Sequence, residues 1–259
     1  MSTASRPKSM KLYTFDAGNI NAPDRGLLAA GRGGQPVTLF VAAFLIQHPR
    51  GNVLVDTGMN PNTWPLPQKN EVVLRPEQRI DKQLAKLGLS PKDIKYVIMT
   101  HLHMDHAGWM TLFPESTFIV RKAELRHAWW PDKWVSFSLA FGDYKDTRDY
   151  SYIQLDDVED FDVFLDGTII CVDSKGHTPG HQSVVVDLPR SGKIVFAGDA
   201  VSLHESLDES VMPGIVWDPD LAQKAIAKLQ HLQRNGARIF LGHDPDFFKT
   251  VKLAPEYYD

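Results

Sequence analysis

The sequence predicts an α/β protein in which layers of strands and helices form a single domain. Short apolar, β-branched segments recur along the chain, and segments with helical spacing separate several of them. No linker and no internal repeat divides the 259 residues, and 43% apolar residues are enough for one sizeable core. We therefore expect residues 1–259 to form one domain, with residues 1–10 as a loose N-terminal arm.

The individual elements follow from local patterns. Apolar residues at helical spacing predict a helix over residues 77–87, and an Asp-Pro pair predicts the start of a helix over residues 218–235. A third helix is expected over residues 122–130. Residues 19–36, rich in Gly, Asn, Pro and Arg, predict a long loop, and residues 131–160 carry no clear pattern. The predicted strands comprise residues 11–15, 37–47, 53–55, 96–100, 117–120, 168–173, 183–188, 193–197 and 238–241.

Composition and charge exclude several functional classes. The formal net charge of -4 gives no general attraction to nucleic acid or to an anionic membrane. No apolar run approaches the roughly 18 residues that span a bilayer, and the polar residues 1–11 lack the apolar stretch of a signal peptide. We therefore expect a cytoplasmic protein with neither nucleic-acid nor membrane partners. The only cysteine in the sequence, Cys171, lies in an apolar strand pattern and is interpreted as structural.

Five of the ten histidines follow predicted strands, at the points where those strands end. They are His101, His103, His106, His177 and His243, and Asp199 follows a strand in the same way. Rigid strands position the loops that come after them, so side chains from several strand ends can meet at one edge of a layered fold. The pattern predicts one shared site.

The segment HLHMDH, which begins at His101, is the most informative. Alternate residues of an extended backbone point the same way, so His101 and His103 can bind one cation. Asp105 and His106 lie on the next bend and can hold a second, and Gly108 allows the chain to turn closely behind them. Burying three histidines and an aspartate without a cation would leave several polar groups unpaired. The segment therefore predicts a metal site.

The HLHMDH segment resembles the H-x-H-x-D-H signature of the metallo-β-lactamase superfamily. Further segments resemble that family in the expected order: VLVDTG at residues 53–58, GHTPGHQS at residues 176–183, Gly198-Asp199 and Gly242-His243-Asp244. The resemblance covers nearly the whole chain from Lys11 and is greatest for the N-acyl homoserine lactonase branch. It implies a four-layer αβ/βα sandwich with the site at its edge.

The resemblance also implies two divalent metal ions and a role for each candidate residue. Zn²⁺ is the default metal, although imidazole and carboxylate ligands also suit Mn²⁺, Fe²⁺ or Co²⁺. Asp56 would orient a ligand histidine from behind. One ion would be held by His101, His103 and His177 and the other by Asp105, His106 and His243, with Asp199 as the bridge.

The implied activity is the hydrolysis of a carboxylic ester bond in a lactone. A hydroxide that bridges the two metal ions would open the ring, and the expected partner is a small-molecule lactone. N-acyl homoserine lactones are the substrates that the branch implies, which would make the protein a quorum-quenching lactonase. Asp105 and Asp199 are the expected catalytic residues, with Asp105 also a proton shuttle. The resemblance is compatible with a homodimer in which residues 19–36 cap a neighbour's site.

One departure from the lactonases concerns the substrate contacts. Those enzymes usually carry a tyrosine three residues after the bridging aspartate, where this chain has Ser202. Ser202 can donate a hydrogen bond but reaches less far, and Tyr144, Tyr150 and His204 are alternatives. Trp109 is expected in an apolar wall of the substrate pocket.

Several other functions on the same site are alternatives. A phosphodiesterase or a glyoxalase II-like thioesterase would use the same metal ligands. A β-lactamase is less favoured, because those enzymes tend to have Cys where this chain has Asp199. A redox protein of the flavodiiron type generally has an acidic residue in place of His103 and an added flavin domain. A binding protein with an inactive site is disfavoured, because every ligand position is filled.

Overall fold

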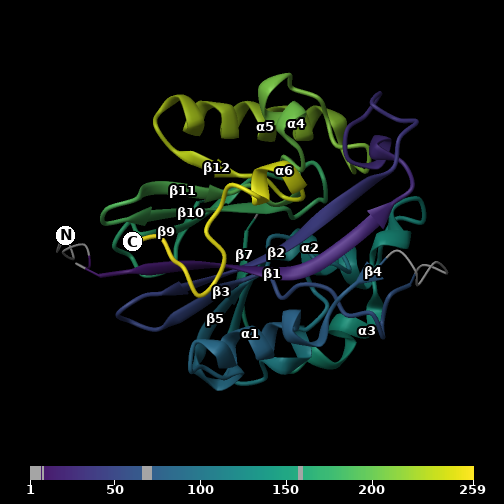
Figure 1. Ribbon diagram of the computed structural model, residues 1–259. Helices are drawn as coiled ribbons and strands as arrows, with labels where there is room; N and C mark the ends of the chain where they lie inside the picture. Colours follow the sequence, from purple (N-terminus) through teal and green to yellow (C-terminus); the bar gives the residue numbers. More distant parts are fainter. Residues whose placement is uncertain (1–6, 8, 66–71, 157–159) are drawn as a thin grey trace.

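A computed structural model of the chain describes residues 7, 9–65, 72–156 and 160–259 (Figure 1). Within these residues, the strands form two sheets that lie face to face, and helices cover the outer side of each sheet. The expected αβ/βα sandwich is thereby confirmed. None of the helices in the described residues combines the length and the apolar character needed to cross a membrane.

The larger sheet mixes antiparallel and parallel strand pairs. In spatial order it contains β4 (Val72–Val73), β1 (Lys11–Ala22), β2 (Val37–Gln47), β3 (Asn52–Val55), β5 (Ile94–Ile98), β6 (Thr117–Arg121) and β7 (Ser151–Leu155). Strands β4, β1, β2 and β3 pair antiparallel, whereas β3, β5, β6 and β7 pair in parallel. The parallel part matters most for the site, because parallel strands end at the same edge and deliver their loops to it.

The smaller sheet is mostly antiparallel. Its spatial order is β12 (Arg238–Phe240), β11 (Gly192–Phe196), β10 (Gln182–Leu188), β9 (Ile169–Asp173) and β8 (Phe161–Asp162). Strands β11 and β12 pair in parallel, and the other pairs are antiparallel. The loops after β11 and β12 therefore leave the sheet at one common edge.

The helices are divided between the two outer faces (Figure 1). Helices α1 (Ile80–Lys86), α2 (Lys122–Trp129) and α3 (Phe141–Tyr144) lie on the side of the larger sheet, α4 (His204–Asp208) and α5 (Pro219–Arg234) lie on the side of the smaller one, and α6 (Pro245–Phe248) follows β12. Helix α5 begins as predicted: Asp218 accepts a hydrogen bond from the backbone N–H of Leu221, and Pro219 occupies the first turn.

Apolar side chains fill the space between the sheets and the space under the helices. Between the sheets, Phe44 of β2 stacks on Phe196 of β11 with ring centroids 3.9 Å apart. Leu84 of α1 belongs to the core under the larger sheet, and Leu229 of α5 belongs to the core over the smaller one. Each sheet is thus buried on both faces, which is why most of its strands are apolar along their whole length.

The expected loop over residues 19–36 begins later than predicted. Residues 19–22 belong to β1, which stays paired with β2 across a β-bulge. One extra residue of β1 is accommodated there, and Gly18 adopts a φ of 105°. The composition of this stretch indicated a loop, but strand pairing extends through its first four residues.

The expected helix over residues 77–87 is also interrupted. A 3₁₀ turn at Pro76–Gln78 precedes α1, and the backbone at Arg79 between them is extended, with a ψ of 137°. Only the second part of the predicted segment is therefore α-helical.

Met10, the last residue of the N-terminal arm expected over residues 1–10, is not loose. Residues 1–6 and 8 lie outside the described residues, but Met10 is buried in the core between the sheets with 2% of its surface exposed. Strand β1 begins at the next residue, Lys11, so the backbone of Met10 is already positioned beside the sheet and its side chain packs into the core. Residues 131–160, which the sequence left unassigned, contain α3, β7 and short 3₁₀ turns.

Replacing Phe196 by alanine is predicted to lower the free energy of unfolding by about 3–5 kcal/mol, because it removes a stacked ring from the core between the sheets. Chemical denaturation measures this loss. The matched variant Phe141→Ala should lose much less, since Phe141 is 52% exposed. Equal losses for the two variants would contradict the placement of Phe196.

Candidate metal centre

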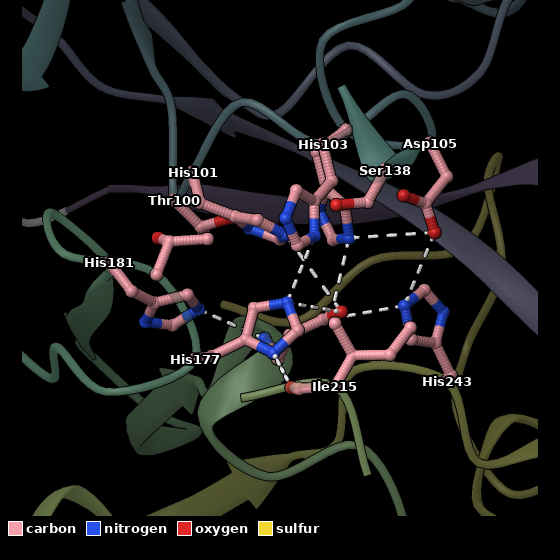
Figure 2. Close-up of polar contacts among 12 residues, drawn as sticks. Thr100, His101, His103, Asp105, Ser138, His177, His181, Ile215 and His243 are labelled. Carbon is pink, nitrogen blue, oxygen red and sulfur yellow. Dashed lines mark hydrogen bonds and ion pairs between the residues drawn. The ribbon is translucent and has the colours of Figure 1, made fainter. Parts of the chain in front are cut away.

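Four loops bring the predicted ligands to one edge of the sandwich. The loop after β5 carries the HLHMDH segment, the loop after β9 carries His177, and Asp199 and His243 follow β11 and β12. Because each loop leaves a rigid strand end, the two sheets determine where the loops meet. Figure 2 shows side chains from three of these loops turned toward one centre: His101, His103 and Asp105 after β5, His177 after β9 and His243 after β12.

The first cluster consists of His101, His103, His177 and Asp199. One ligand atom from each of these four buried residues lies within 4.8 Å of all the others. The Nε2 atom of His177 is 3.0 Å from Nδ1 of His103. Asp199 directs Oδ2 at the same cluster, 3.3 Å from Nε2 of His177 and 3.8 Å from Nε2 of His101.

The second cluster consists of Asp105, His106 and His243, whose ligand atoms also lie within 4.8 Å of one another. Oδ2 of Asp105 is 3.4 Å from Nε2 of His243 and 3.8 Å from Nε2 of His106. The other oxygen of Asp199, Oδ1, points here: it is 3.0 Å from Nε2 of His243 and 3.4 Å from Nε2 of His106. The two carboxylate oxygens of Asp199 therefore point toward two different clusters.

The donor atoms in these clusters suit cations. Nε2 of His101, Nε2 of His106 and Oδ1 of Asp199 are buried without a hydrogen-bond partner. Buried polar atoms in native proteins are nearly always satisfied, so unpaired atoms that converge on one point indicate a ligand. Imidazole and carboxylate groups bind divalent transition metals, and the seven side chains fit two such ions.

The outer ring nitrogens of three of the histidines are fixed by hydrogen bonds. Nδ1 of His106 donates to Oδ2 of Asp56 over 2.8 Å, Nδ1 of His177 donates to the carbonyl of Ile215 over 2.7 Å, and Nδ1 of His243 donates to the carbonyl of Phe40 over 2.9 Å. Such bonds select the tautomer that leaves Nε2 free for a metal. The structure thus places Asp56 directly behind a candidate ligand.

Asp56 also connects the two clusters through Thr100. It accepts hydrogen bonds from the backbone N–H and the hydroxyl of Thr100, both at 2.7 Å, and that hydroxyl lies 3.1 Å from Nδ1 of His101. Asp56 has a φ of 58°, a conformation that few residues other than glycine adopt and that aspartate tolerates better than most. This backbone conformation directs the carboxylate toward both His106 and Thr100.

Two buried residues near the ligands were not assigned a role from the sequence. His181 accepts a hydrogen bond at Nε2 from the backbone N–H of Asp199 over 3.0 Å, and its Nδ1 lies 2.9 Å from the hydroxyl of Ser174. Burial lowers the pKa of His181 to about 3, so the ring is neutral and able to accept. Its position in the GHTPGH segment, four residues after the candidate ligand His177, could have indicated this role from the sequence. The second residue is Glu124 of α2. The sequence does not distinguish it from the other polar residues of a helix of ordinary composition, so its position near the ligands could not be predicted.

An apolar cavity of about 110 Å³ opens onto the clusters. His103, Asp105, His177, Asp199 and His243 lie at its polar end. None of the described residues lining it is a lysine or an arginine. Its apolar walls are formed by Ile20, Ala22, Pro23, Leu27, Leu28, Leu39, Trp64, Met104, Phe137, Pro213 and Ile215.

Ser202 also lines this cavity, and its buried hydroxyl has no hydrogen-bond partner. The alternatives to Ser202 lie elsewhere. The hydroxyl of Tyr144 donates to the carbonyl of Ala128, that of Tyr150 donates to a backbone carbonyl, and His204 is paired with Asp244. None of these three lines the cavity.

Trp109 does not form the pocket wall that the sequence suggested. It is absent from the residues that line the cavity and packs against the core under the larger sheet, where the guanidinium of Arg79 lies 5.2 Å from its ring centroid. The chain turns at Gly108, where it passes very close to residues 58–60. An added Cβ would lie 2.3 Å from the backbone nitrogen of Asn60, so a larger residue would not fit this turn. The turn directs the next side chain away from the cavity. Trp64 supplies an aromatic wall instead.

The electrostatics of the two clusters differ. Burial, and then the charges of His106 and His103, hold the pKa of His101 well below its ordinary value, which favours the neutral imidazole that metals require. Burial would also lower the pKa of His243, but the carboxylates of Asp199 and Asp105 outweigh it and raise that pKa to about 9. Carboxylates likewise raise the pKa of His106 well above its ordinary value, against the effect of burial.

A sequence model described as the Metallo-beta-lactamase superfamily matches residues 36–243, a range that includes all seven candidate ligands. The chain therefore belongs to the metallo-beta-lactamase superfamily.

Curated relatives and solved structures narrow this assignment. The chain is 32% identical to the N-acyl homoserine lactonase AttM of Azorhizobium caulinodans, over 96% of this chain and 99% of that protein. It is 30% identical to the AttM lactonase of Agrobacterium fabrum, over 96% and 98%. A mutant of AiiA from Bacillus thuringiensis, solved with N-decanoyl-L-homoserine bound at its active site, has a TM-score of 0.83 and 27% identity, covering 96% of this chain and 98% of that one. The chain thus falls in the lactonase branch of the superfamily.

Binding of metal to protein stripped with a chelator is predicted to release protons at pH 7. His243, whose pKa is raised to about 9, carries a proton at pH 7 that a metal must displace, and the raised pKa of His106 acts in the same direction, so affinity at the second cluster should rise as pH increases toward about 9. Calorimetric titration with Zn²⁺ in buffers of different ionisation enthalpy measures the release. The His243→Ala variant should release fewer protons than the unmodified protein, and equal release from both would contradict this account.

Proposed function

We propose that this protein is a dinuclear metal-dependent hydrolase that opens the lactone ring of N-acyl homoserine lactones, and so acts in quorum quenching. The observation that carries the proposal is the position of Asp199, between two clusters of metal-binding side chains at the polar end of an apolar cavity. The names of the relatives and the product-bound structural neighbours support the choice of substrate.

In this proposal, His101, His103 and His177 would hold one divalent ion, Asp105, His106 and His243 would hold the other, and Asp199 would contribute to both. Zn²⁺ is the proposed metal, with Mn²⁺, Fe²⁺ and Co²⁺ as alternatives for the same ligands. Bound ions of this kind lower the pKa of a water molecule so that it attacks as hydroxide at neutral pH, and they polarise a substrate carbonyl.

The side chains of the protein orient the substrate and move a proton. The apolar walls bind the acyl chain and exclude bulk water, which leaves the lactone carbonyl at the polar end of the cavity. The reaction adds one water to the ring: a C–O bond forms at the carbonyl carbon, and the ester C–O bond of the ring breaks. Asp105, which lines the cavity and is 8% exposed, takes the proton of the attacking water and returns it to the leaving oxygen.

Ser202 is proposed to donate a hydrogen bond to the substrate. Its hydroxyl is buried and unpaired at the cavity wall, and its backbone carbonyl accepts from the N–H of His243 over 2.9 Å. The residue is therefore held close to the second cluster, where a lactone oxygen would lie.

The metal-loaded protein is predicted to hydrolyse N-hexanoyl-L-homoserine lactone and to leave phosphodiesters and thioesters intact. The cavity suits an acyl chain, and among its described lining residues there is no lysine or arginine that would bind a phosphate. A pH-indicator assay follows the reaction, because opening the ring produces a carboxylic acid. Phosphodiester or thioester cleavage without lactone turnover would refute the lactonase proposal.

The His103→Ala variant is predicted to lose this activity and to bind fewer than two equivalents of metal, as measured by elemental analysis. The matched control is His231→Ala, because His231 is exposed on α5. A His103→Ala protein that retains two equivalents of metal would contradict the ligand assignment.

Ser202→Ala is predicted to lower kcat/KM roughly tenfold with the metal content unchanged, the effect of losing about one hydrogen bond. Steady-state kinetics measures it. Ser138→Ala is the matched control: Ser138 lines the same cavity, but its hydroxyl already donates to the carbonyl of Val135 over 2.9 Å. Similar losses in both variants would argue against a specific contact by Ser202.

A further inference from the structure

A buried carboxylate lies behind the first cluster and does not face the cavity. Glu124, in the first turn of α2, is 0% exposed. It accepts hydrogen bonds from the backbone N–H of Leu102 over 2.8 Å, from the hydroxyl of Thr178 over 2.6 Å and from the backbone N–H of Gly180 over 3.1 Å. One oxygen serves Leu102, and the other serves Thr178 and Gly180.

These three donors come from two loops that are far apart in sequence. Leu102 lies between the candidate ligands His101 and His103, and Thr178 directly follows His177. The carboxylate of Glu124 therefore holds together the two loops that supply the histidines of the first cluster. The short distance between the rings of His103 and His177, 3.0 Å between Nδ1 and Nε2, lies across this junction.

The second loop is also packed against the backbone of α2. A Cβ added to Gly180 would lie 2.2 Å from the backbone nitrogen of Glu124, so the loop approaches the helix as closely as a residue without a side chain allows. Burial raises the pKa of Glu124 to about 7, while the hydrogen bonds from Thr178, Leu102 and Gly180 act in the opposite direction and favour the carboxylate, as does the partial positive charge of the first turn of a helix. A buried carboxylate is costly unless it is fully hydrogen-bonded, and here the donors that satisfy it belong to the ligand loops.

We propose that Glu124 is a positioning residue that sets the separation of His101 and His103 from His177, and so determines the affinity of the first cluster for its metal ion. The proposal rests on the ligand assignment given under the proposed function. Glu124 does not touch the substrate. It acts through Leu102, Thr178 and Gly180.

Titration of chelator-stripped protein with Co²⁺, followed by the visible absorption of the bound ion, tests the proposal without any measurement of activity. Glu124→Ala should weaken one of the two binding steps by about 10–100-fold, the range found for partners that orient metal ligands. Glu124→Gln keeps the shape of the side chain but turns an amide N–H₂ toward a donor, and it should give an intermediate loss. Thr178→Val removes one hydrogen bond from the other side and should weaken the same step.

Ser116→Ala is the control for a general loss of stability. Ser116 is also 0% exposed, and its hydroxyl donates to the carbonyl of Ile94 over 2.7 Å, away from both ligand loops. This variant should lower the melting temperature of the metal-free protein but leave both Co²⁺ affinities unchanged.

Wild-type Co²⁺ affinities in both Glu124→Ala and Thr178→Val would overturn the proposal, and so would an equal weakening in Ser116→Ala. If Glu124→Ala does not fold, Thr178→Val and Glu124→Gln decide the outcome by the same readout. Failure of the unmodified protein to bind Co²⁺ would instead refute the dinuclear site of the proposed function, so the two failures are distinguishable.

Discussion

The carboxylate of Asp199 lies between two groups of imidazoles, with one oxygen toward each group, and the rest of the site is arranged around it. A buried carboxylate next to several buried imidazoles is stable only where charge and hydrogen bonds balance. His181 fixes the backbone of Asp199 from behind, and Asp56 and backbone carbonyls fix the outer nitrogens of the histidines. Nε2 of His101, Nε2 of His106 and Oδ1 of Asp199 remain unpaired within the clusters, which is the arrangement that two cations would satisfy.

The sandwich supplies the rigidity that this arrangement needs. Two sheets packed through Phe44 and Phe196 hold the strand ends at one edge, and each loop adds only a few residues between a strand and its ligand. Glu124 then joins two of those loops from outside. The positions of the ligand side chains thus depend on several sets of buried residues: the core holds the strands, the strands hold the loops, and hydrogen bonds from neighbouring residues hold the ligands.

The sequence was sufficient to predict most of the strands, the layered fold and the residues that converge at the edge, because apolar periodicity and histidines at strand ends are local signals, but β4, β7 and β8 were missed. It could not predict the wall of the cavity. Trp109 is next to Gly108 in sequence, yet the turn directs it into the core, while Trp64 arrives from a distant loop. The role of Glu124 was also hidden, because it depends on which two loops meet at the helix. The strand continuing through residues 19–22 was missed for the same reason: its pairing with β2 is a tertiary property that outweighs loop-like composition.

The most direct test of the account is anomalous X-ray diffraction from crystals of the metal-loaded protein, collected at the absorption edge of the metal. Two anomalous peaks are expected, one on each side of Asp199, the first among His101, His103 and His177 and the second among Asp105, His106 and His243. A single peak, or peaks bound by other side chains, would contradict the bridging role of Asp199 and with it the proposed dinuclear hydrolase.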